Sequence, residues 1–152
     1  MQVKEILRIK GGTLWSVTPS TLMSEAVITM AEHDIGSVLV MEGGKLAGML
    51  TFREIIKILA KRQIEHRIGP TPTMAEIKVS DVMVSDPGLA TPDMEVDDLR
   101  SLMLARHQRY VPVMDGDTLQ GVISFHDVAK AVLEEQAFEN RMLKGYIKDW
   151  PA

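Results

Sequence analysis

The chain has 152 residues, of which 45% are hydrophobic and 25% charged, and its formal net charge is −4. This composition is typical of a soluble globular domain, and its acidic balance disfavours nucleic acid as the main partner because that surface requires concentrated Lys and Arg. The lack of cysteine excludes disulfides, thiolate metal sites and cysteine nucleophiles. No apolar run approaches the ~20 residues that span a bilayer, and the first residues lack the apolar core of a signal peptide. We therefore expect a cytoplasmic protein with no membrane partner.

The two halves of the sequence are copies of one pattern, 73 positions apart. Thr18-Pro19 corresponds to Thr91-Pro92, and Gly48 corresponds to Gly121. The other first-copy positions that recur are Met30, Val38, Val40, Met41, Gly43, Leu46, Phe52 and Lys57. An ordered series of identities without a gap predicts a duplicated structural unit.

In chain order, the first predicted element is a short helix over Val3–Ile9. An amphipathic helix follows the first Thr-Pro, with Ser20 or Thr21 as its candidate N-cap. Two strands, Ser37–Met41 and Leu46–Leu50, then flank a glycine turn, which predicts a hairpin, and a second helix starts at Thr51.

The second copy repeats these elements. Val79–Met83 stands where the short leading helix stood, and Asp93 is the candidate N-cap of the next helix. The predicted strands are Tyr110–Met114 and Leu119–Ile123, and the last helix starts at Ser124.

These elements predict an α/β (α+β) fold with four parts. We expect a first repeat with its leading helix over residues 1–60, a linker over 61–78 and a second repeat over 79–133. A C-terminal helix over 134–152 is expected to close the core or to form a dimer contact. One β-α-β-β-α unit cannot cover both faces of its own sheet, so the two repeats are expected to pack through their sheets.

One motif occurs in both copies: a strand ends in a hydroxyl residue, and a carboxylate follows three positions later. The pairs are Thr51 with Glu54 and Ser124 with Asp127. This spacing is typical of a capping box at a helix start. The same carboxylate could also accept hydrogen bonds from the two hydroxyls of a ribose, while helix N-terminal amides favour phosphate. The residues alone leave both interpretations open.

The duplicated pattern resembles the CBS (cystathionine-β-synthase) domain family. The resemblance rests on the Thr-Pro entry, the Val-Leu-Val or Val-Pro-Val strand, the glycine turn and the Gly-x-x-[Ser/Thr]-x-x-acid motif, and it runs from about Val3 to Leu133. The chain is most similar to stand-alone bacterial tandem CBS pairs, also called Bateman modules. That resemblance implies two pseudo-twofold-related repeats, two clefts that hold AMP, ADP, ATP, NAD(H) or S-adenosylmethionine, and a homodimer. It implies a regulatory or sensor module without catalysis, signalling through conformation or assembly to an unknown effector protein.

The resemblance also implies roles for particular residues. In the second copy, Asp127 would hold the ribose beside Ser124. The remaining second-copy positions are Thr91 at the entry strand, Tyr110, Val111 and Pro112 along the adenine, and Arg109 and His126 toward the phosphate. The equivalent first-copy positions are Thr18, Gly36, Ser37, Val38, Thr51, Arg53 and Glu54, and Lys10 is a further phosphate candidate. Because Glu54 replaces the usual aspartate, we expect the first cleft to bind more weakly or to take a different ligand.

Two alternative functions remain. A nucleotide-processing enzyme would need a base aligned with a nucleophile, or a metal cluster, and the sequence shows no such pattern. The acids from Asp93 to Asp98 lack the glycine of a calcium loop, and the histidines lack metal-ligand spacing. A structural dimerisation module with degenerate clefts is the other alternative. We expect no catalytic residue and no metal site.

Overall fold

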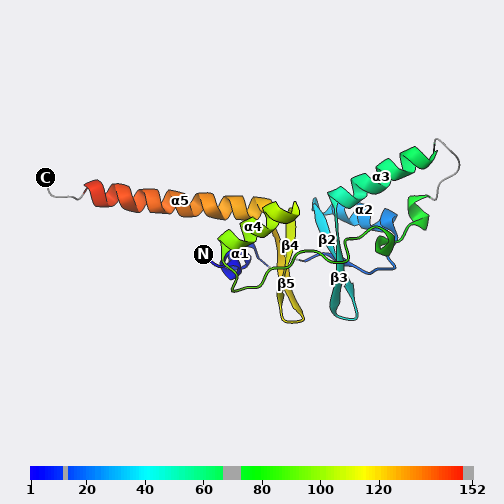
Figure 1. Ribbon diagram of the computed structural model, residues 1–152, viewed down its shortest axis with the longest axis horizontal. Coiled ribbons are helices and arrows are strands. Elements are labelled where there is room, and N and C mark those ends of the chain that lie inside the picture. The colour runs from blue at the N-terminus through cyan, green and yellow to red at the C-terminus, as the bar shows by residue number, and fades with distance from the viewer. Residues whose placement is uncertain (12–13, 67–72, 149–152) are drawn as a thin grey trace.

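A computed structural model describes residues 1–11, 14–66 and 73–148 of the chain (Figure 1). The first half contains α1 (Val3–Lys10), β1 (Ser16–Val17), α2 (Met23–Glu32), β2 (Ser37–Glu42), β3 (Lys45–Thr51) and α3 (Phe52–His66). Two 3-10 turns follow, η1 (Met74–Glu76) and η2 (Val79–Asp81). The second half contains α4 (Val96–Arg106), β4 (Tyr110–Asp115), β5 (Thr118–Ser124) and α5 (Phe125–Lys148). The mixed α/β fold and the duplicated element order are confirmed, and each hairpin strand ends within a residue of its predicted bound.

Each repeat is built on one antiparallel hairpin. In the first repeat, β2 pairs with β3, and β1 adds a short parallel strand on the other side of β2. In the second repeat, β4 pairs with β5, and the entering segment makes only a parallel bridge between Ala90 and Val113. The two turns contain Gly43 and Gly116 with φ angles of 57° and 60°, a left-handed conformation that glycine adopts without steric cost.

The predicted N-caps of the repeat helices are wrong. The N-cap residues are Leu22 for α2 and Glu95 for α4, and neither makes a side-chain capping hydrogen bond. The hydroxyl of Thr21 instead accepts a hydrogen bond from the Thr18 amide at 3.0 Å, within the turn before the helix. Asp93 pairs with the Lys4 ammonium at 3.3 Å, so its carboxylate serves a contact with α1.

Each hairpin has its own hydrophobic core, and the leading elements are exchanged between the cores. The core of the second repeat includes Val3 and Ile6 of α1, both almost fully buried. The core of the first repeat includes Ile77, directly after η1, and Val79, the first residue of η2. The leading helix therefore packs on the second repeat, against α5 and β5, and not on the repeat with which the sequence grouped it. The apolar face of α1 and its hydrogen bonds to the second repeat, such as Val3 N to Met94 O at 2.9 Å, fix it there.

The repeated glycine of the motif marks the place where each leading element crosses the other repeat. A Cβ atom on Gly48 would lie 2.6 Å from the backbone oxygen of Val84, and one on Gly121 would lie 2.8 Å from Cδ2 of Leu7. Val84 and Met49 also exchange two backbone hydrogen bonds of 2.9 Å. The glycine is thus required because a neighbouring segment passes too close for a side chain.

The helix α5 continues without a break through the predicted boundary at residues 133 and 134. Its first turns belong to the core through Val128, and its second half extends away from the rest of the molecule (Figure 1). The large apolar side chains exposed on that half are Phe138, Met142, Leu143 and Tyr146, and Leu133 is exposed one turn before it. The loop predicted at Gly69-Pro70-Thr71-Pro72, and Trp150, lie outside the described residues. Among the helices of the described residues, none has the length and apolarity that a bilayer crossing requires.

Two candidate binding clefts

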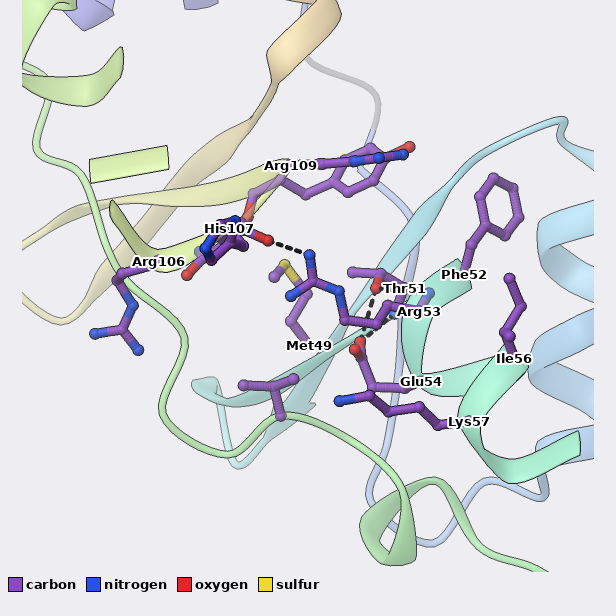
Figure 2. A pocket seen from close by; sticks show the side chains of 13 residues that line it. Met49, Thr51, Phe52, Arg53, Glu54, Ile56, Lys57, Arg106, His107 and Arg109 are labelled. Carbon is purple, nitrogen blue, oxygen red and sulfur yellow. Dashed lines mark hydrogen bonds between the residues drawn. The ribbon is translucent and has the colours of Figure 1, made fainter. Parts of the chain in front are cut away.

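Two of the clefts between the repeats include a hydroxyl residue of the repeated motif, and each takes residues from both repeats. The larger, called cleft 1, has a volume of about 530 Å³. It is lined by Thr51 and the first two turns of α3 from the first repeat, and by residues 106–110 and Val84 from the second-repeat side. Figure 2 shows this cleft with its labelled side chains.

The smaller cleft, called cleft 2, has a volume of about 240 Å³. It is lined by Ser124 and the end of β5 from the second repeat, by residues 34–37 from the first, and by Lys10 and Trp15 from the leading segment. Trp15 stacks on His33, with ring centroids 3.5 Å apart. Cleft 2 thus repeats the plan of cleft 1 with the roles of the two repeats exchanged.

The sequence analysis assigned all the residues of one site to one copy of the repeat, and the structure shows that this assignment is wrong. Arg109 was grouped with Asp127, yet it lines cleft 1 together with Glu54. Gly36 and Ser37 were grouped with the first copy, yet they line cleft 2 together with Ser124 of the second. The two hairpins lie side by side with β3 in contact with β5 (Figure 1). Each cleft therefore combines the motif of one hairpin with the strand entry of the other.

Tyr110 belongs to both clefts. A Cβ atom on Gly36 would lie 1.8 Å from its hydroxyl oxygen, so the ring occupies the space that a side chain at position 36 would take. Gly36 and Tyr110 thus meet where the two clefts adjoin.

In cleft 1, the hydroxyl–carboxylate pair forms a closed turn at the start of α3. The amide and the hydroxyl of Thr51 both donate to Oε1 of Glu54, at 2.9 and 2.8 Å. Glu54 is only 6% exposed, and its Oε2 accepts no hydrogen bond from any residue that the structure describes. The capping interpretation is therefore correct, and one carboxylate oxygen is still left to accept further donors.

At cleft 2, Ser124 lines the cleft and Asp127 is hydrogen-bonded behind it, and this equivalent pair carries an additional partner. The Ser124 amide donates to Oδ2 of Asp127 at 2.9 Å, and the Asp127 amide donates to the Ser124 hydroxyl at 3.0 Å. The Lys10 ammonium donates to the same Oδ2 at 2.7 Å and to the Val122 carbonyl at 2.8 Å. Burial acts to raise the pKa of Asp127, but the hydrogen bonds from Lys10 and Ser124 outweigh it and hold the pKa below its ordinary value.

Several cationic side chains line cleft 1. The guanidinium of Arg53 donates to the His107 carbonyl, which joins the two repeats across the cleft (Figure 2). Lys57 and Arg109 line the same cleft. Within residues 1–11, 14–66 and 73–148, none of these three cations forms an ion pair with a carboxylate.

The remaining predicted site residues lie outside both cleft linings, and Asp127 is one of them, although it is hydrogen-bonded to Lys10 and Ser124 of the lining of cleft 2. Val38, Val111 and Pro112 are buried in the strands, whereas Thr18, Thr91 and His126 are exposed. The sequence-based reasoning missed Phe52, Ile56, Lys57, Arg106, His107 and Trp15, all of which line a cleft. Only the recurrence of Phe52 and Lys57 in the second copy signalled two of them. Among the described residues, no three His, Asp or Glu side chains are grouped so that they could hold a metal ion.

Comparison with known proteins gives one family. The model of the CBS domain matches residues 3–61 and 79–134. The CBS domain-containing protein YhcV of Bacillus subtilis is 32% identical over 114 residues, which are 75% of either chain. The crystal structure of the CBS-domain containing protein ATU1752 from Agrobacterium tumefaciens superposes with a TM-score of 0.76 at 30% identity, over 86% of this chain and 98% of that one. The structure of CBSX2 in complex with AMP shares the fold, with a TM-score of 0.71 at 20% identity over 89% and 98% of the two chains.

Proposed function

Because this chain belongs to the CBS domain family, as a tandem pair of two such domains, we propose that it is a regulatory module that binds adenine nucleotides in its two clefts. The observation that carries the proposal is the set of groups at each cleft: a hydroxyl residue in the lining, a carboxylate hydrogen-bonded to that residue, an aromatic side chain and a cation. These are the groups that a ribose, a purine and a phosphate require.

The geometry of cleft 1 suits a whole nucleotide. Its volume of about 530 Å³ lies within the range of small-molecule sites. Phe52 and Ile56 are more than half exposed and, with Tyr110, offer an apolar surface to the base. Oε2 of Glu54 is available to ribose hydroxyls, and Arg53 and Arg109 are available to phosphate.

In cleft 2 we assign the ribose to Asp127 and Ser124, with Trp15 as the aromatic neighbour. The volume of about 240 Å³ is small for a nucleotide, and Oδ2 of Asp127 already accepts a hydrogen bond from Lys10. A ligand there must share Asp127 with Lys10 or displace it. We therefore expect the two clefts to differ in affinity.

The AMP bound in the CBSX2 structure supports an adenine ligand, and AMP, ADP, ATP and NAD(H) are the candidates. Binding would change the conformation or assembly of the module, and a separate effector protein would receive that change. The proposed assembly is a homodimer, because α5 exposes a row of large apolar side chains that a second copy could cover. The cytoplasmic location expected from the sequence remains a prediction.

Thermal unfolding scans of the chain with AMP, ADP, ATP, NAD, NADH and S-adenosylmethionine test the proposal. A ligand that binds only the folded state stabilises it by about 2.7 kcal/mol at a hundredfold excess over Kd, which shifts the Tm of a domain of this size by several degrees. An unchanged Tm with all six compounds would reject nucleotide binding and favour a purely structural dimerisation module. Conversion of a bound nucleotide, detected by chromatography, would favour an enzyme instead.

Calorimetric titration of Asp127→Ala tests the ribose assignment. We expect one class of sites to disappear, because the variant lacks the carboxylate that would accept the ribose hydroxyls. The same stoichiometry in the variant and in the unmodified chain would reject the assignment while leaving nucleotide binding intact.

A further inference from the structure

We propose that the two clefts select ligands of different charge: cleft 1 binds an adenine nucleotide with two or more phosphates, whereas cleft 2 does not favour added phosphates. The proposal rests on the proposed function and adds the ligand class of each cleft. Its basis is the distribution of cations between two clefts that descend from one duplicated unit.

The duplication itself provides the comparison, since position n in the first copy corresponds to position n + 73 in the second. Three arginines of cleft 1 are replaced at the equivalent positions of the other copy: Arg109 by Gly36, Arg106 by His33 and Arg53 by His126. Only Lys57 has a cationic counterpart, Lys130. The excess of positive charge in cleft 1 is therefore a difference between the repeats and not a property of the shared fold.

The three cations Arg53, Lys57 and Arg109 are also uncompensated. Among the described residues none of them has a carboxylate partner, and the acid of the cleft, Glu54, is hydrogen-bonded to Thr51. Arg106 lies apart from them: its guanidinium is directed away from Arg53 (Figure 2) and donates to the Asp86 carbonyl at 2.9 Å, whereas that of Arg53 donates to the His107 carbonyl across the cleft. Unpaired cations in a concave site concentrate positive potential, and guanidinium groups pair with phosphate oxygens through two parallel hydrogen bonds.

The charges that line cleft 2 balance each other, since they are Lys10 and Asp34 among the described residues. Its cation, Lys10, is already bound to Asp127 and to a backbone carbonyl, and Asp34 contributes a negative charge to the lining. A chain of phosphates in cleft 2 would meet Asp34, and the part of the lining that the structure describes holds no second Lys or Arg to offset it. Added phosphates are therefore expected to strengthen binding in cleft 1 only.

Isothermal titration calorimetry of the full chain with adenosine, AMP, ADP and ATP tests the proposal. We expect one class of sites to bind ATP at least about tenfold more tightly than AMP, which is the factor that about 1.4 kcal/mol provides. This preference should shrink as salt is raised, because the salt screens exposed charges. The other class should gain nothing from added phosphates. Equal affinities for AMP and ATP at every site would overturn the proposal but leave the proposed function standing.

The substitutions Arg109→Gln and Arg53→Gln locate the effect, with Lys130→Gln as the control that removes a cation outside both linings. Arg109→Gln should weaken the binding of ATP by about tenfold, as expected for the loss of a charged hydrogen bond. The same substitution should weaken the binding of adenosine by less than about threefold. Lys130→Gln should change neither. An equal loss of affinity for ATP and adenosine in both arginine variants would overturn the proposal. Thermal scans of each variant check that it folds.

Inorganic tripolyphosphate is the further probe. If it binds to the chain while no adenine compound does, cleft 1 is a basic anion site and the proposed nucleotide function is wrong.

Discussion

The ammonium of Lys10 lies 2.7 Å from Oδ2 of Asp127, although the two residues are 117 positions apart. The contact joins the end of α1 to the first turn of α5. The carboxylate that the sequence analysis assigned to a ribose is thus engaged by an internal cation before any ligand arrives. Lys10 therefore contributes to folding as well as to the electrostatics of cleft 2.

The Lys10–Asp127 pair predicts a pH-dependent contribution to stability. The folded-state pKa of Asp127 is lowered, so its contribution is present above the unfolded pKa and is lost as pH falls through the folded one. Both side chains are partly exposed, at 34% and 20%, and we expect Lys10→Met to cost about 0.5–1 kcal/mol at pH 7. Urea unfolding from pH 7 downward should show the two stability curves converging below about pH 4, where free aspartate protonates.

The matched control for that measurement is Lys4→Met. Lys4 lies on α1, as Lys10 does, and its ion pair with Asp93 is more exposed. It should change stability by less than Lys10→Met at pH 7. If the free energies of unfolding of Lys10→Met and of the unmodified chain differ by the same amount at every pH, the prediction is wrong.

The repeated glycines predict unequal costs for one substitution at equivalent positions. At Gly48 an added methyl meets the backbone oxygen of Val84, whereas at Gly121 it meets the tip of the flexible Leu7 side chain. Gly48→Ala should therefore cost about 1–3 kcal/mol, as overpacking commonly does, and Gly121→Ala clearly less. Urea unfolding compares the two variants, and equal costs would show that the backbone crossing at Val84 does not limit position 48.

The contact between Gly36 and Tyr110 predicts strong coupling. Gly36→Ala should displace the Tyr110 ring, and because Tyr110 lines both clefts, it should weaken nucleotide binding at both classes of sites. In the Tyr110→Ala background the added methyl no longer meets the hydroxyl, so Gly36→Ala should cost little further stability. A double-mutant cycle in urea should give a coupling energy of about 0.5–3 kcal/mol. If the two substitutions lower the free energy of unfolding additively, Gly36 and Tyr110 are not in contact.

The exposed apolar row on α5 predicts self-association. Phe138→Glu and Met142→Glu should lower the mass measured by light scattering during size exclusion, because a charge buried without a partner weakens an apolar interface. Asn140→Glu adds the same charge at a polar position of the same helix and should leave the mass unchanged. A monomeric mass for the unmodified chain, or a dimer that survives both substitutions, would exclude this helix as the dimer contact.

The sequence was a reliable guide wherever the signal was local. The hairpin strands, the glycine turns and the hydroxyl–carboxylate pairs depend on the period and spacing of neighbouring residues, and their bounds were predicted closely. The N-caps failed although they are also local. The Thr21 hydroxyl accepts a hydrogen bond from Thr18 in the preceding turn, and Asp93 pairs with Lys4. The apolar periodicity of the helix does not predict either of these competing contacts.

By itself, the sequence determined that this protein consists of two unequal copies of one helix–hairpin–helix unit, because an ordered series of identities records the duplication directly. Only the tertiary structure decided which residues share a cleft. It brought Arg109 into the same cleft as Glu54 and Lys10 beside Asp127, and it placed α1 on the core of the other repeat. These contacts depend on how two hairpins pack side by side and on which core buries each leading element, and periodicity within a segment contains no information on either.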